Sequence, residues 1–169
     1  MTHVTAHALR WLVAGALFTL PVAAHAQARG LKVGDAAPMP VIASLDGAPT
    51  SLASVIAGRP ALIEFWATWC PLCRSMEPSI KAMATTYGDK LAIVRIVVPT
   101  NQTPERAKAA VQKGALPGTF LFDTDGAAYK AFAAYHTSYI LVLDRKGQVL
   151  YSQDGGAQDL TAVIKKAVE

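Results

Sequence analysis

Cysteine and charged residues are scarce in this sequence. Only two cysteines occur among 169 residues, and charged side chains make up 17% of the chain, whereas 52% of residues are hydrophobic. A chain of this length can bury a core without disulfide staples. The low charge and the high apolar content exclude disorder for the bulk of the chain. We therefore expect one globular domain.

Blocks of basic residues are also missing. The net charge is +4, and the Lys and Arg residues are scattered along the chain rather than clustered beside aromatic residues. Proteins that bind nucleic acids present a concentrated basic face. We therefore interpret these charges as a solvated surface and expect no nucleic-acid partner.

Residues 1–26 differ in character from the rest of the chain. They contain one Arg, Arg10, and no acidic residue, followed by the apolar run WLVAGALFTLPVAA and by small residues at Ala24 and Ala26. This order is typical of a secretory signal peptide. The run is shorter than the roughly 20 residues that a membrane-spanning helix needs. We expect cleavage before Gln27 and a periplasmic protein, with an uncleaved N-terminal anchor as the alternative.

The remaining residues, 27–169, alternate between strand and helix patterns. Uninterrupted apolar runs at 61–67 and 91–98 predict strands that are buried on both faces. Further strands are predicted near 41–44, just after the turn at 46–47, at 120–122 and twice within 139–152, and helices are predicted at 70–87, 103–114, 125–135 and 157–168. This order predicts an α/β sandwich with a central mixed sheet and helices on both sides.

Both cysteines lie in the stretch IEFWATWCPLC, where a buried strand is followed by a helix. Pro71 suits the first helical position, and the helix dipole favours a thiolate on Cys70. Cys73 lies one turn into the helix and should be shielded. We expect Cys70 to attack a substrate disulfide and Cys73 to release the resulting mixed disulfide.

Other roles for two cysteines at this spacing fit the sequence less well. A purely structural disulfide would close too short a loop to stabilise the fold much. Haem attachment needs a His directly after the second cysteine, where Arg74 stands. Structural zinc needs four ligands, and residues 27–169 offer two cysteines, His136 and carboxylates. A binding module without redox activity remains open.

The stretch FWATWCPLC resembles the active site of thioredoxin-fold disulfide oxidoreductases. Its flanks resemble the TlpA-like (ResA/CcmG-type) exported branch, which includes reductases of cytochrome c maturation. The matching segments are VGDAAP, LDGAPTSL, GRPALIEFWATWCPLC, FLFDTDGAAYKAFAAY and LVLDRKGQVLY. The resemblance implies a thioredoxin-like three-layer α/β/α sandwich over 27–169, with an N-terminal β-hairpin extension and dithiol–disulfide exchange as its activity.

The resemblance also implies roles for individual residues. Cys70 matches the nucleophile, Cys73 the resolving thiol, and Glu64 the buried acid beneath the cysteines. Burial in an apolar strand should raise the pKa of Glu64, so that it accepts the proton of Cys73. The alternative for Glu64 is an acid that is simply hydrogen-bonded or reaches solvent. Residues expected at the substrate groove are Trp69, Pro71, Thr137 and Ser138, whereas Trp66 is expected in the core.

Two positions depart from the family pattern. In CRSMEP, Met76 and Glu77 stand in swapped order, which argues against a catalytic role for Glu77. In YHTSYILVLD, Ser138 stands where the family carries a cis-proline opposite the disulfide. We expect a trans Thr137–Ser138 bond, because a cis bond before a residue other than proline costs about 2.5–4 kcal/mol.

The loss of this proline motivates an alternative function. Cys70, Cys73 and His136 could together bind a soft metal such as Cu(I). The principal interpretation needs no cofactor beyond the redox-active Cys70–Cys73 pair. The implied partners are protein thiols and disulfides, with apocytochrome c or copper-site proteins as candidates, together with a membrane thiol electron donor. We expect a monomer.

Overall fold

The computed structural model describes residues 29–169, so the predicted signal peptide and its cleavage site lie outside the described part of the chain. Strands and helices follow one another in the predicted order. The elements are β1 (Val41–Ser44), β2 (Pro49–Ser51), α1 (Leu52–Ile56), β3 (Ala61–Trp66), α2 (Pro71–Tyr87), a 3-10 turn η1 (Gly88–Lys90), β4 (Ala92–Val97), α3 (Pro104–Gly114), β5 (Thr119–Phe122), α4 (Ala127–Ala131), β6 (Tyr139–Leu143), β7 (Val149–Gln153) and α5 (Thr161–Val168).

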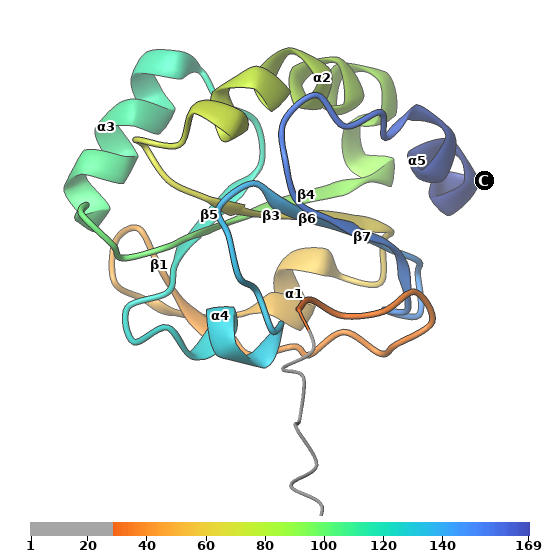
Figure 1. Ribbon diagram of the computed structural model, residues 1–169, viewed down its shortest axis with the longest axis horizontal. Coiled ribbons are helices and arrows are strands. Elements are labelled where there is room, and N and C mark those ends of the chain that lie inside the picture. The colour runs from red at the N-terminus through yellow and green to blue at the C-terminus, as the bar shows by residue number, and fades with distance from the viewer. Residues whose placement is uncertain (1–28) are drawn as a thin grey trace, which may run out of the picture.

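The strands form one mixed sheet in the order β2-β1-β5-β4-β3-β6-β7. The central strands β3, β4 and β5 are parallel, whereas β6 and β7 continue the sheet antiparallel on one side. β1 and β2 form the predicted N-terminal hairpin, in which β1 pairs antiparallel with β5 on the other side and β2 is the edge strand. Figure 1 shows α2, α3 and α5 over one face and α1 and α4 over the other. The predicted three-layer sandwich is confirmed.

Two apolar clusters hold the layers together. On the face covered by α2 and α5, the buried side chains include Leu62, Met76, Ile80, Ile140 and Ile164. The other cluster lies between the opposite face of the sheet and helices α1 and α4, and it includes both cysteines. Since β3 contributes to both clusters, all six of its residues are buried. The cysteine pair is thereby attached directly to the core.

Several helix boundaries agree with the sequence, but the helix predicted within 125–135 ends at Ala131, because Ala133 has a φ of +47°. Thr103 caps α3 as predicted, with its side chain accepting a hydrogen bond from the N–H of Arg106. The last helix was predicted from residue 157 but begins at Thr161, because Ala157 has a φ of +56° and cannot belong to a right-handed helix. Within residues 29–169, no helix combines the length and apolar character required to cross a membrane.

Candidate active site

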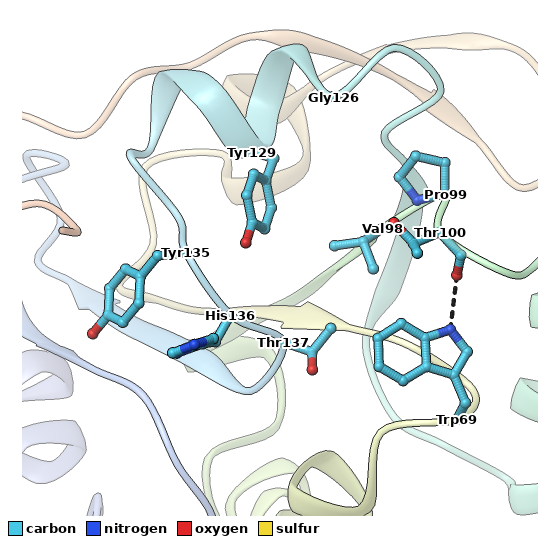
Figure 2. Close-up of a pocket in the computed structure, with 9 residues that line it drawn as sticks. All are labelled: Trp69, Val98, Pro99, Thr100, Gly126, Tyr129, Tyr135, His136 and Thr137. Atoms are coloured by element: carbon cyan, nitrogen blue, oxygen red, sulfur yellow. Dashed lines mark hydrogen bonds between the residues drawn. The ribbon is translucent and has the colours of Figure 1, made fainter. Parts of the chain in front are cut away.

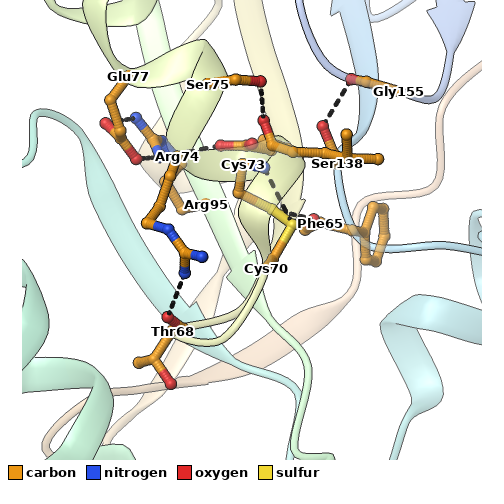
Figure 3. Close-up of a disulfide and its surroundings, with 12 residues drawn as sticks. Phe65, Thr68, Cys70, Cys73, Arg74, Ser75, Glu77, Arg95, Ser138 and Gly155 are labelled. Atoms are coloured by element: carbon orange, nitrogen blue, oxygen red, sulfur yellow. Dashed lines mark hydrogen bonds and ion pairs between the residues drawn. A yellow bond between two sulfur atoms is a disulfide. The ribbon is translucent and has the colours of Figure 1, made fainter.

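Cys70 and Cys73 form a disulfide at the amino-terminal end of α2 (Figure 3). Cys70 is the N-cap residue, and its Sγ accepts a hydrogen bond from the backbone N–H of Cys73 over 3.0 Å. Pro71 follows at the first helical position, where an N–H would have no helical partner. After reduction, this placement favours negative charge on the Sγ of Cys70.

Both cysteines are buried, with exposed fractions of 1% for Cys70 and 0% for Cys73. The Sγ of Cys73 lies 4.0 Å from the carbonyl oxygen of Phe65, at the end of β3. The residues next to the pair are more open, with exposed fractions of 39% for Trp69 and 46% for Leu72. These two apolar side chains are therefore the exposed part of the surface on either side of Cys70.

Glu64 lies in the middle of β3 and is completely buried. Its Oε2 is 2.9 Å from a guanidinium nitrogen of Arg95, but within the described residues neither oxygen of Glu64 has a partner with hydrogen-bond geometry. Burial raises the pKa of Glu64 to about 7, a rise that the charge of Arg95 opposes and that of Glu77 reinforces. The carboxyl group can therefore gain or lose a proton near neutral pH.

Arg95 is a site residue that the sequence analysis did not identify. It is fully buried in β4, directly beside Glu64 in the parallel register, and its guanidinium lies 5.5 Å from the centre of the Phe120 ring. Glu77, for which no role was expected, binds Arg95 through both carboxylate oxygens, at 2.7 and 3.0 Å (Figure 3). The sequence feature that could have indicated Arg95 is its position as the single charged residue within the apolar run LAIVRIVV.

Ser138 is buried and faces the disulfide region from the loop before β6 (Figure 3). Residues 29–169 contain no cis peptide bond, so the Thr137–Ser138 bond is trans, as predicted. Ser138 has a φ of +62° and donates two hydrogen bonds of 2.7 Å, from its N–H to the carbonyl of Phe65 and from its Oγ to the carbonyl of Gly155. The loop is thus attached to both β3 and the segment after β7.

A cavity of about 430 Å³ opens beside the exposed ring of Trp69 (Figure 2). The indole N–H of Trp69 donates a 2.7 Å hydrogen bond to the carbonyl of Thr100, which holds the ring as one wall. Of the four residues predicted at the substrate groove, Trp69 and Thr137 line this cavity, whereas Pro71 and Ser138 do not. The lining residues are Trp69, Val98, Pro99, Thr100, Gly126, Tyr129, Tyr135, His136 and Thr137.

His136 lines the same cavity but is engaged with Asp154, at 2.9 Å between Nδ1 and Oδ2. Tyr135 donates a hydrogen bond from its hydroxyl to the other oxygen of Asp154. Partial burial, reinforced by this bond, raises the pKa of Tyr135 to about 12. In the described part of the chain, no three His, Cys, Asp or Glu side chains gather as a metal site. Copper binding by Cys70, Cys73 and His136 stays a prediction.

Comparisons with known proteins agree with this geometry. The family model named Redoxin matches residues 32–166. Thioredoxin-like protein YneN of Bacillus subtilis is 33% identical over 123 residues, which are 71% of this chain and 70% of YneN. Thiol:disulfide interchange protein DsbE of Yersinia pestis is 31% identical over 106 residues, which are 60% of this chain and 52% of DsbE.

A solved structure supports the fold. It is the thioredoxin domain of thiol-disulfide oxidoreductase BVU-2223 from Bacteroides vulgatus, which superposes with a TM-score of 0.70 at 21% sequence identity. The superposition covers 82% of this chain and 99% of that domain. At this level of identity, the match concerns the fold alone.

Proposed function

The chain belongs to the Redoxin family, in its TlpA-like thioredoxin-fold branch, and is a thiol–disulfide oxidoreductase; we propose that it acts outside the cytoplasm as a reductant of partner proteins. The observation that carries thiol–disulfide exchange is the position of Cys70, whose Sγ lies at the amino terminus of α2 and accepts the N–H of Cys73. This position stabilises the thiolate that begins the reaction. The direction, reduction of the partner, is proposed from the resemblance to the reductases of cytochrome c maturation.

The proposed reaction starts from the reduced pair. The thiolate of Cys70 attacks one sulfur of a partner disulfide, so that a mixed disulfide forms and the other partner sulfur leaves as a thiolate. Cys73 then gives up its proton, attacks the sulfur of Cys70 and displaces the second partner sulfur. Two electrons pass to the partner, and Cys70–Cys73 is left as a disulfide. A donor dithiol, which we propose to be in the membrane, restores the reduced pair.

Glu64 is proposed as the acceptor for the proton of Cys73. Glu64 directly precedes Phe65 in β3. The carbonyl oxygen of Phe65 lies 4.0 Å from the Sγ of Cys73. A carboxyl group with a pKa of about 7 can take up this proton at neutral pH and release it later. Glu64 would therefore accelerate the release of the mixed disulfide rather than its formation.

The proposed location rests on the sequence of residues 1–26, with Arg10, the apolar run and the small residues before Gln27. Outside the cytoplasm, thiol pairs of partner proteins tend to be oxidised, and a dedicated reductant is needed to keep them available. Candidate partners are apocytochrome c, whose haem-attachment motif is Cys-x-x-Cys-His, and proteins with paired cysteines at a copper site.

Two measurements test the proposal. The reduction potential of the Cys70–Cys73 pair, equilibrated with glutathione, should lie near the roughly −270 mV of thioredoxin, and a value near the roughly −120 mV of strong oxidants would reverse the assigned direction. The Cys73→Ser variant should accumulate a mixed disulfide with an oxidised Cys-x-x-Cys-His peptide. The Cys70→Ser variant is the matched control and should form none.

A further inference from the structure

Arg95 is shared unequally between two carboxylates. It binds Glu77 with two hydrogen bonds, one from each terminal nitrogen, whereas its contact with Glu64 is a single 2.9 Å approach without hydrogen-bond geometry. The terminal nitrogens of Arg95 are thus oriented by Glu77. The three side chains form a cluster of one guanidinium and two carboxyl groups between the sheet and α2.

Among residues 29–169, the positive charge that compensates a charge on Glu64 is that of Arg95. The charged groups that face it are Arg95 from β4 and Glu77 from α2, while its neighbour on β6 is the apolar Ile140. Glu77 retains some contact with solvent, with a side-chain exposed fraction of 15%, whereas Glu64 has none. The lack of solvent contact favours the protonated form of Glu64.

We propose that Glu77 is a positioning residue for the thiol chemistry: by holding Arg95 through both carboxylate oxygens, it keeps Arg95 from hydrogen-bonding to Glu64 and leaves Glu64 free to exchange a proton. Glu77 lies one helical turn after Cys73, so α2 carries both the resolving thiol and the residue that controls the acid beneath it. This inference rests on the proposed role of Glu64 in proton transfer.

The direction of the effect follows from electrostatics. Glu77→Gln removes a negative charge close to Glu64 and releases the guanidinium of Arg95, which can then hydrogen-bond to Glu64. Both changes favour the ionised form of Glu64. The midpoint of its titration should therefore move to lower pH by about one unit or more.

The chain contains four glutamates, Glu64, Glu77, Glu105 and Glu169, so a direct measurement is practicable. Protein labelled with carbon-13 at the glutamate carboxyl groups is titrated by NMR in the oxidised state, and the Glu64 signal is assigned by its loss in Glu64→Gln. The Glu77→Gln variant should show the shifted midpoint. Glu105→Gln, which alters an exposed carboxylate at the start of α3, is the matched control and should leave the midpoint unchanged.

An unchanged Glu64 midpoint in Glu77→Gln overturns the proposal. If that variant does not fold, Glu77→Asp replaces it: the charge is kept, but the shorter side chain cannot hold Arg95 in the same way. A smaller downward shift of the midpoint is then expected, and no shift overturns the proposal.

The thiol reaction supplies the second measurement, which separates this inference from the proposed function. The pH profile for release of the mixed disulfide should move to lower pH in Glu77→Gln. A shifted NMR midpoint with an unmoved pH profile overturns the link between Glu77 and the thiol chemistry. Absence of thiol exchange in the wild-type protein refutes the proposed function, while the titration still decides whether Glu77 controls the proton of Glu64.

Discussion

The backbone N–H of Ser138 donates a 2.7 Å hydrogen bond to the carbonyl oxygen of Phe65. The same carbonyl oxygen lies 4.0 Å from the Sγ of Cys73, so one acceptor links the loop before β6 to the resolving cysteine. A proline at this position, as in the family pattern, has no N–H to donate. The serine therefore attaches the loop to β3 by a bond that the usual residue cannot make.

We predict that Ser138→Pro destabilises the protein, although it restores the usual residue. Proline requires a φ near −65°, whereas Ser138 has +62°, and the bond to Phe65 would be lost. The free energy of unfolding should fall by more than about 1 kcal/mol. Urea denaturation of the oxidised protein measures this loss. Ser138→Gly, which keeps the N–H and suits a positive φ, should lose less, and equal stability of the two variants would contradict the prediction.

The second prediction concerns the pH dependence of stability through Glu64. Its pKa is raised from 4.5 to about 7 in the folded protein, so unfolding releases a proton between these values, and folding stability falls as the pH rises through this range. The full effect is of the order of 3 kcal/mol and is complete above the folded pKa. Glu64→Gln cannot ionise, so its stability should depend less on pH. Urea denaturation at about pH 5 and pH 8 in the oxidised state compares the two. An equal change in unfolding free energy between the two pH values in wild type and variant would contradict the raised pKa of Glu64.

The third prediction concerns Arg95. Arg95→Met leaves Glu64 and Glu77 without their shared counter-ion, and breaking a buried ion pair in this way costs about 3–5 kcal/mol of unfolding free energy. The control is Lys108→Met, which removes the exposed pair between Lys108 and Asp46 and should cost less than about 1 kcal/mol. Chemical denaturation near pH 7 compares them. Similar losses in both variants would show that Arg95 is not the counter-ion on which the cluster depends.

Most of the fold could be predicted because the local signals and the tertiary structure agree. The apolar runs that became β3 and β4 are long and free of turn residues, and Thr103 with Pro104 marks the start of α3. The start of α5 could not be predicted. The side-chain amide of Gln158 donates hydrogen bonds to the carbonyl of Gly155 nearby and to that of Ser138, 20 residues away in sequence. The second contact attaches the segment before α5 to the loop before β6, which the local sequence does not reveal.

The cysteine pair could be found from its motif, but the charged cluster beside it could not. Pairing of Glu64 with Arg95 depends on the register of two parallel strands, and strands buried on both faces lack the alternation that would reveal their register. The role of Glu77 also depends on a contact between distant segments, because its partner Arg95 lies in β4 and not in the helix that carries the cysteines. Three-dimensional contact was needed to join them.

The last prediction concerns substrate binding at the cavity beside Trp69, the residue that precedes Cys70. Trp69 forms one wall of this cavity and is exposed, so its ring can pack against the segment of a partner that flanks the target disulfide (Figure 2). Trp69→Ala should raise the KM for a peptide disulfide by about fivefold or more, as expected when an aromatic anchor is removed, and should leave the reduction potential of Cys70–Cys73 unchanged. Trp66→Phe is the matched control, because Trp66 is buried in the core against Phe120 and its replacement should lower stability without changing KM. Steady-state kinetics with the peptide, together with glutathione equilibration, measures both quantities. A Trp69→Ala variant with unaltered KM would show that partners approach the disulfide from another side.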